Sequence, residues 1–206
     1  MAAIITGTKR PSGTSAVWNW PNLLTALRFV LTVPIFVCIL LGWFGIATVL
    51  LAVAGVSDWL DGYLARKLKS GTALGRNLDP LADKVLVSGS LILLIPVDSS
   101  GVAAWMVVVI VCRELIVTSL RSFLEHAGTP FGAALLGKLK MVLQLLALLT
   151  VLAYLALAPD LQNLPTARKT LWLARDALLY GTVGITVISG IEYIWRAYKT
   201  CQDRVA

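Results

Sequence analysis

Six apolar stretches separated by short polar segments divide almost all of this 206-residue chain. A stretch of about 20 apolar residues is long enough to cross the hydrocarbon core of a bilayer as a helix. The mean hydropathy is +0.81, and only 14% of the residues are charged, against about a quarter in a soluble domain. The pattern predicts an all-α membrane protein with six transmembrane helices, at about 23–41, 43–68, 79–95, 102–124, 133–158 and 167–198.

One membrane domain, residues 16–200, accounts for nearly the whole chain. We expect a flexible N-terminal tail at 1–15 and a short C-terminal tail at 201–206. Residues 16–22 predict a short interfacial helix ahead of the first span, with Pro21 bending the entry.

Lys and Arg gather before the first stretch, between the second and third, between the fourth and fifth, and after the sixth. Basic residues favour the cytoplasmic side, so both termini are predicted to be cytoplasmic. A multi-pass protein of the bacterial inner (cytoplasmic) membrane is the simplest interpretation. The net charge of +7 then indicates contact with anionic lipid headgroups rather than with nucleic acid.

Four of the 11 acidic residues fall in one window between the second and third stretches. Asp58 and Asp61 are three residues apart, and Asp79 and Asp83 are four apart, so each pair shares one side of a helix. A short polar turn joins the two helices. The two pairs are therefore predicted to meet near the cytoplasmic ends of antiparallel neighbours.

Four carboxylates in a small volume repel one another and call for a cation. Hard oxygen ligands favour Mg²⁺, Mn²⁺ or Ca²⁺ over zinc. Two metal ions about 4 Å apart are a known arrangement for displacement at phosphorus. An Asp-x-x-Asp pair on a membrane helix is also compatible with a proton relay, so a metal or proton transporter stays open here.

Small and basic residues accompany the aspartates. Gly62 and Ala65 lie on the same helix face as Asp58 and remove side-chain bulk there. Arg66 and Gly75 flank the turn, where a planar base or a phosphate has room to bind.

The complete string Asp-x2-Asp-Gly-x2-Ala-Arg-x8-Gly-x3-Asp-x3-Asp resembles the signature of the CDP-alcohol phosphotransferases. The resemblance implies the fold of that family, two divalent ions (Mg²⁺ or Mn²⁺) and a homodimer. It implies that Asp58, Asp61 and Asp79 hold metal, and that Asp83 is the general base and a metal ligand as well. The residues that it assigns to the CDP donor are Asn22, Thr25, Gly62, Ala65, Arg66 and Gly75, with Arg28 as a further candidate.

The acceptor site is predicted from basic residues on the fourth and fifth stretches. Arg113 lies inside an apolar run, where an unpaired cation is costly. Glu114 is adjacent in sequence and is predicted to point elsewhere. A phosphate on the acceptor would suit this set, which comprises Arg113, Arg121, Lys138 and Lys140.

The basic set and the segment 19–28 are similar to those of family members that use glycerol 3-phosphate. The expected reaction is transfer of the phosphatidyl group from CDP-diacylglycerol, giving phosphatidylglycerophosphate and CMP. A cardiolipin synthase that uses phosphatidylglycerol as acceptor is the alternative within the family. A transporter is less favoured, because all four aspartates lie near one membrane face instead of along a path across it.

Overall fold

The computed structural model describes the backbone of residues 20–68, 73–126 and 135–205, and the side chains of 30–57, 84–122, 124, 137, 139–200 and 202. The described residues form helices and no strand. This confirms the all-α prediction. The helices are α1 (Trp20–Leu40), α2 (Phe44–Leu68), α3 (Ala73–Leu94), α4 (Ala104–His126), α5 (Leu135–Leu157), the 3₁₀-helix η2 (Asp160–Asn163) and α6 (Pro165–Val205).

Two helices differ from their predicted ranges. The third helix was predicted to start near Asp79. That start is wrong: α3 begins at Ala73 and continues through Pro80. At the other end of the chain, α6 extends to Val205. Of the predicted N-terminal tail and interfacial helix, residues 1–19 lie outside the described residues, while residues 20–22 open α1.

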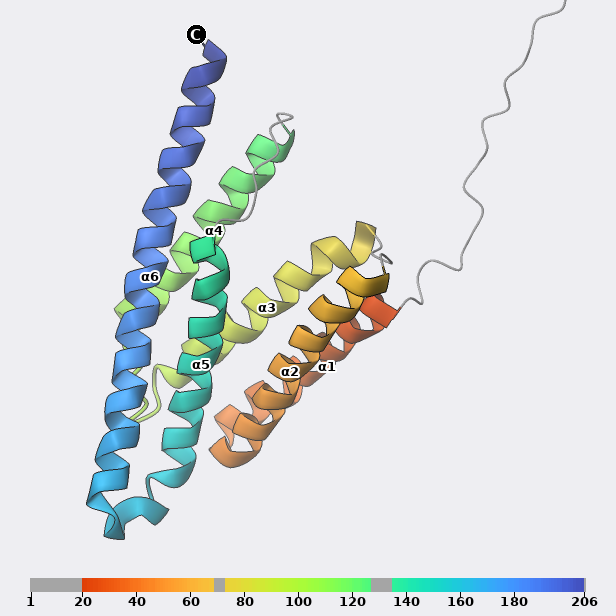
Figure 1. Ribbon diagram of the computed structural model, residues 1–206. Coiled ribbons are helices and arrows are strands. Elements are labelled where there is room, and N and C mark those ends of the chain that lie inside the picture. Colours follow the sequence, from red (N-terminus) through yellow and green to blue (C-terminus); the bar gives the residue numbers. More distant parts are fainter. Residues whose placement is uncertain (1–19, 69–72, 127–134, 206) are drawn as a thin grey trace, which may run out of the picture.

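The helices alternate in direction, so their ends form two groups (Figure 1). We call the end that holds the start of α1, the end of α2 and the start of α3 the aspartate end. The end of α4, the start of α5 and the C-terminus of α6 also lie toward it. The opposite end holds the three connections 41–43, 95–103 and 158–164.

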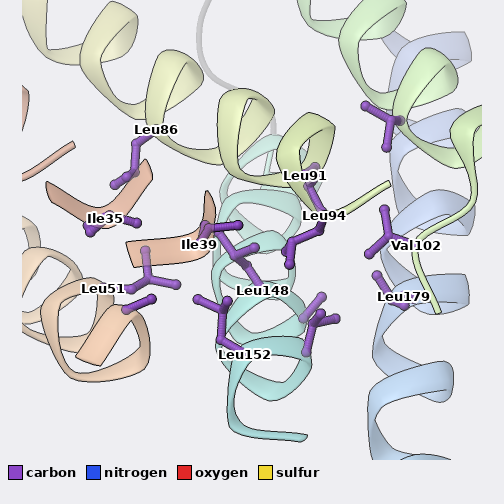
Figure 2. Packing of buried hydrophobic residues seen from close by; sticks show 14 of the residues in the cluster. Ile35, Ile39, Leu51, Leu86, Leu91, Leu94, Val102, Leu148, Leu152 and Leu179 are labelled. Carbon is purple, nitrogen blue, oxygen red and sulfur yellow. The ribbon is translucent and has the colours of Figure 1, made fainter. Parts of the chain in front are cut away.

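The helices pack in two groups, and contacts made by α3 and α5 connect the groups. Helix α1 packs against α2 and α3, whereas α6 packs against α4 and α5. Helix α5 also contacts α2 and α3, and α3 also contacts α4. Figure 2 shows the apolar core at these junctions, where side chains from five helices meet: Ile35 and Ile39, Leu51, Leu86, Leu91 and Leu94, Leu148 and Leu152, and Leu179.

Helix ends follow from local sequence. Gly42 adopts a φ of +73°, the left-handed conformation that glycine tolerates best. Its N–H donates to the Ile39 carbonyl, and the Trp43 N–H donates to the Cys38 carbonyl, so α1 ends in a Schellman motif. Helix α6 starts at Pro165, a residue whose missing N–H costs nothing in a first turn.

Two helical segments in the described part of the chain are long and apolar enough to cross a membrane, Leu139–Leu157 and Pro165–Thr200. The outward faces of other helices carry large apolar side chains as well. Val49, Val53 and Val56 on α2 are all exposed. An apolar exterior of this kind is typical of a protein surrounded by lipid.

A buried arginine fixes the opposite end. The side chain of Arg175 on α6 is 4% exposed, and its Nε and Nη2 lie 2.8 and 2.7 Å from Oδ1 of Asp176. Its Nη1 donates to the Ser99 carbonyl, and its guanidinium lies over the Tyr154 ring, 4.5 Å from the centroid. Gly101 packs directly against the guanidinium. One side chain thus ties the α3–α4 connection to α5 and α6.

Candidate functional site

The aspartates occupy two helices at the aspartate end. Asp58 and Asp61 lie in the last three turns of α2, and Asp79 and Asp83 in the first three turns of α3. Five Cα steps join Leu68 to Ala73, which keeps these helix ends within about 18 Å of each other. The four side chains lie outside the described set. Among the side chains that the structure does describe, no three acidic, histidine or cysteine residues gather into a possible metal site.

The predicted donor residues belong to the same end. Asn22, Thr25 and Arg28 lie in the first half of α1, which packs against both α2 and α3. The others lie near the aspartates: Gly62, Ala65 and Arg66 on α2, and Gly75 on α3. Their side chains are also outside the described set, so their placement on these helices is all that the structure adds to the prediction.

A buried ionic cluster is formed where α4 and α5 meet at this end. The Lys140 ammonium, on a residue only 2% exposed, pairs with Oε1 of Glu114. The same oxygen lies 3.2 Å from Nη1 of Arg113. One carboxylate oxygen therefore bridges two cations, and the prediction that Glu114 points away from Arg113 is wrong. Successive helix positions diverge, but both side chains are long enough to bend toward Lys140.

Residues of α6 also contact the Arg113 side chain. Nη2 of Arg113 donates to the Ser189 hydroxyl at 2.9 Å, and the guanidinium lies 5.5 Å from the Tyr193 ring centroid. Gly190 allows this approach, because a Cβ there would lie 3.1 Å from Cγ of Arg113. Residues of α4 and α6 thus hold this arginine.

A third cation reaches the cluster from α3. Lys84 directly follows Asp83 in the sequence, and its ammonium donates to the Thr118 hydroxyl on α4. That hydroxyl in turn donates to the Glu114 carbonyl at 2.6 Å. Lys84 and Arg113 both lie close enough to Lys140 for their positive charges to act on it. The aspartate-bearing helix therefore contacts the cationic cluster.

The cluster has donors to spare. Among the described residues, two cations, Arg113 and Lys140, share the single carboxylate of Glu114. Nε of Arg113 and Nε2 of Gln144, one turn beyond Lys140, are buried without a described hydrogen-bond partner. Buried donors are normally satisfied, so this surplus favours an anion with several oxygen acceptors.

The remaining predicted acceptor residues are Arg121 and Lys138. Arg121 lies two turns beyond Arg113 on α4 and is exposed. The side chain of Lys138 is outside the described set. The residues that the sequence did not single out are Glu114, Lys84, Ser189 and Tyr193. A carboxylate inside an apolar run and a lysine near the start of another were signals for Glu114 and Lys84, whereas Ser189 and Tyr193 required the packing of α6.

Comparisons with known proteins match most of the chain. The family model for CDP-alcohol phosphatidyltransferase matches residues 18–188. A protein of Bacillus subtilis (strain 168) is 39% identical over 203 residues, covering 89% of this chain and 99% of the relative.

Two further relatives are 36% identical. The one from Pseudomonas fluorescens aligns over 193 residues, 88% of this chain and 93% of the relative. The one from Escherichia coli (strain K12) aligns over 195 residues, 91% and 99% respectively. All three bear the name CDP-diacylglycerol–glycerol-3-phosphate 3-phosphatidyltransferase.

Proposed function

Because the chain belongs to the CDP-alcohol phosphatidyltransferase family, we propose that it transfers the phosphatidyl group from CDP-diacylglycerol to glycerol 3-phosphate. The products are phosphatidylglycerophosphate and CMP. The observation that carries the choice of acceptor is the cationic cluster around Arg113 and Lys140, with its unpartnered Nε. An acceptor that already bears a phosphate complements this charge, whereas an uncharged alcohol leaves it unbalanced.

A divalent metal fits the donor set at the ends of α2 and α3. Carboxylate oxygens are the ligands that Mg²⁺ and Mn²⁺ prefer. We assign Asp58, Asp61, Asp79 and Asp83 to two such ions. When bound, they would neutralise phosphate oxygens and stabilise the CMP leaving group.

The chain's own groups divide the remaining work. Arg113 and Lys140 bind the acceptor phosphate, and Ser189 and Glu114 hold these two cations in place. Asp83 removes the proton from the attacking hydroxyl. The hydroxyl oxygen then forms a bond to the donor's phosphorus nearer the diacylglycerol, the bond from that phosphorus to CMP breaks, and CMP departs with its electron pair.

The contact between Lys84 and Thr118 supports this division, because it holds α3 and α4 together one residue away from Asp83. The proton acceptor and the acceptor-binding helix are thus neighbours. Proximity of this kind converts an encounter between two molecules into a step within one complex.

The site requires access to a lipid donor and a water-soluble acceptor. We propose six transmembrane spans in the bacterial inner membrane, with both termini and the aspartate end in the cytoplasm. A homodimer is part of the same proposal. Basic residues at the aspartate end, Arg66 and Lys67 on α2 and Arg76 on α3, support the orientation, since Lys and Arg near span ends favour the cytoplasmic side.

An acceptor panel tests the reaction. Purified protein with CDP-diacylglycerol and Mg²⁺ or Mn²⁺ receives glycerol 3-phosphate, phosphatidylglycerol, inositol phosphate or serine in turn, and released CMP is measured. We expect glycerol 3-phosphate to give the fastest release. Preference for phosphatidylglycerol would indicate a cardiolipin synthase instead, and absence of release with every alcohol would contradict the proposed reaction.

Aspartate variants test the metal assignment. We expect Asp58→Ala, Asp79→Ala and Asp83→Asn each to abolish CMP release. Asp98→Asn serves as a matched control, because Asp98 is an exposed aspartate in the connection at the opposite end. Full activity in any of the three site variants would refute the two-helix metal site.

A further inference from the structure

The connection between α5 and α6 forms a second cationic site, at the end of the molecule opposite the aspartates. A cavity of about 320 Å³ lies there, lined by Tyr154 of α5, Gln162 of η2, and Pro165, Arg168, Lys169 and Trp172 of α6. No carboxylate lines it. The reaction proposed above uses none of these residues.

The two cations of this cavity have no counter-charge in the described part of the chain. Arg168 and Lys169 are exposed, and no described carboxylate forms an ion pair with either. The nearby Asp176 is engaged by Arg175, and Asp160 lies exposed on η2. This contrasts with Arg175, whose charge is balanced within the protein.

The cavity wall is aromatic and held in place. Trp172 is 41% exposed, and the Arg175 guanidinium lies 6.0 Å from its ring centroid. The same guanidinium covers the buried Tyr154 ring. Tryptophan at the end of an apolar helix is typical of the headgroup level of a bilayer, so the proposed membrane arrangement places this cavity at the level of lipid phosphates.

We propose that this cavity binds the phosphodiester headgroup of an anionic phospholipid in the leaflet opposite the aspartate end. Arg168 and Lys169 contact the phosphate, Gln162 offers an amide to the headgroup, and Trp172 packs against the glycerol region. A zwitterionic lipid brings its own cation close to Arg168 and Lys169, which disfavours it. Free phosphate has no group to occupy the aromatic wall.

Native mass spectrometry of the protein in neutral detergent tests this site. Wild type is titrated separately with phosphatidylglycerol, phosphatidylcholine and inorganic phosphate. We expect one phosphatidylglycerol to bind tightly and to bind about 30-fold more weakly to the Arg168→Gln/Lys169→Gln variant, since each cation contributes about 1 kcal/mol near an anionic lipid.

The matched control is Arg196→Gln/Lys199→Gln, which removes the same charge from exposed positions on the same helix at the other end. It should retain the tight phosphatidylglycerol. Equal losses in the two variants, equal binding of phosphatidylcholine, or inorganic phosphate that displaces the lipid would each overturn the proposal. Because the readout is lipid binding, the outcome is independent of CMP release. All four substituted residues are exposed, and a size-exclusion profile shared with wild type will verify that both variants are folded.

Discussion

Two arginines at opposite ends of the molecule, Arg175 buried and Arg113 largely buried, have nearly the same surroundings. Arg113 and Arg175 each pair with the acidic residue that follows in sequence, and each lies over a tyrosine ring. Each also packs against a glycine and donates to a residue 76 positions away.

The difference between them lies in the donors that are left over. Every nitrogen of Arg175 has a partner: Nε and Nη2 face Asp176, and Nη1 faces the Ser99 carbonyl. Arg113 keeps a buried Nε without a described partner and shares its carboxylate with Lys140. A satisfied arginine stabilises the fold, whereas an unsatisfied one beside further cations is prepared to bind an anion.

Of the changes at the two arginines, Arg113→Ala should have the larger effect on activity. Truncating one partner of a desolvated charge pair costs about 2–5 kcal/mol, so we expect kcat/KM for glycerol 3-phosphate to fall about 30-fold or more. Steady-state CMP release with each substrate varied in turn measures this. The KM for CDP-diacylglycerol should change little. An equal rise in KM for both substrates would contradict the acceptor role and indicate that Arg113 binds the donor.

Arg175→Ala should give the largest effect on stability. We expect a loss of about 3 kcal/mol, because Asp176 and the Ser99 carbonyl both lose their partner. Thermal unfolding in detergent measures the loss. Arg175→Lys should restore only part of it, since an ammonium cannot reproduce the paired contacts with Asp176. Activity per folded molecule should remain near wild type. A selective change in KM for glycerol 3-phosphate would contradict a purely structural role for Arg175.

Gly101→Ala probes the contact on which Arg175 depends. Gly101 has a φ of +74°, and a Cβ there would lie 2.8 Å from Cζ of Arg175. We expect a destabilisation of about 2 kcal/mol from backbone strain and crowding. In the Arg175→Ala background, Gly101→Ala should destabilise the protein less, because only the backbone strain at positive φ remains. Strictly additive unfolding free energies in this double-mutant cycle would contradict the contact.

Ser189→Ala should have the smallest effect of the set. It removes one hydrogen bond to the Arg113 guanidinium, worth about 1.5 kcal/mol, so the KM for glycerol 3-phosphate should rise about tenfold. Thr182→Val is the matched control, because it removes a buried α6 hydroxyl that has no described partner. If both variants raise the KM alike, the effect comes from α6 packing instead of from Arg113.

Apolar length and turn chemistry made most of the fold predictable. Five of the six predicted helices begin within a few residues of their observed starts, because each apolar stretch is bounded by glycine, proline or charge. The predicted start of α3 near Asp79 was wrong, because the helix begins at Ala73 and continues through Pro80. A proline inside a helix is tolerated when surrounding contacts compensate, and local sequence does not record those contacts.

In the candidate site, burial could be predicted for a residue that lies far inside an apolar run. Arg113 lies deep in an apolar run, and its burial follows from that position. Glu114 was misjudged because helix-face reasoning treats side chains as short, although arginine and glutamate reach around a turn. Ser189 and Tyr193 lie 76 and 80 residues beyond Arg113, so only tertiary packing brings them to it. The roles of the aspartates and of the donor residues stay predictions.

The hydrogen bond between Lys84 and Thr118 fixes the rotation of α3 about its own axis relative to α4. A helix turns about 100° per residue, so Asp83 and Lys84 point in directions fixed relative to each other. Anchoring Lys84 on α4 therefore sets the angle at which α3 presents its aspartates. This one hydrogen bond therefore aligns the helix of the proposed metal ligands with the helix of the proposed acceptor site. A rotation of α3 that turned its carboxylates away would first have to break it.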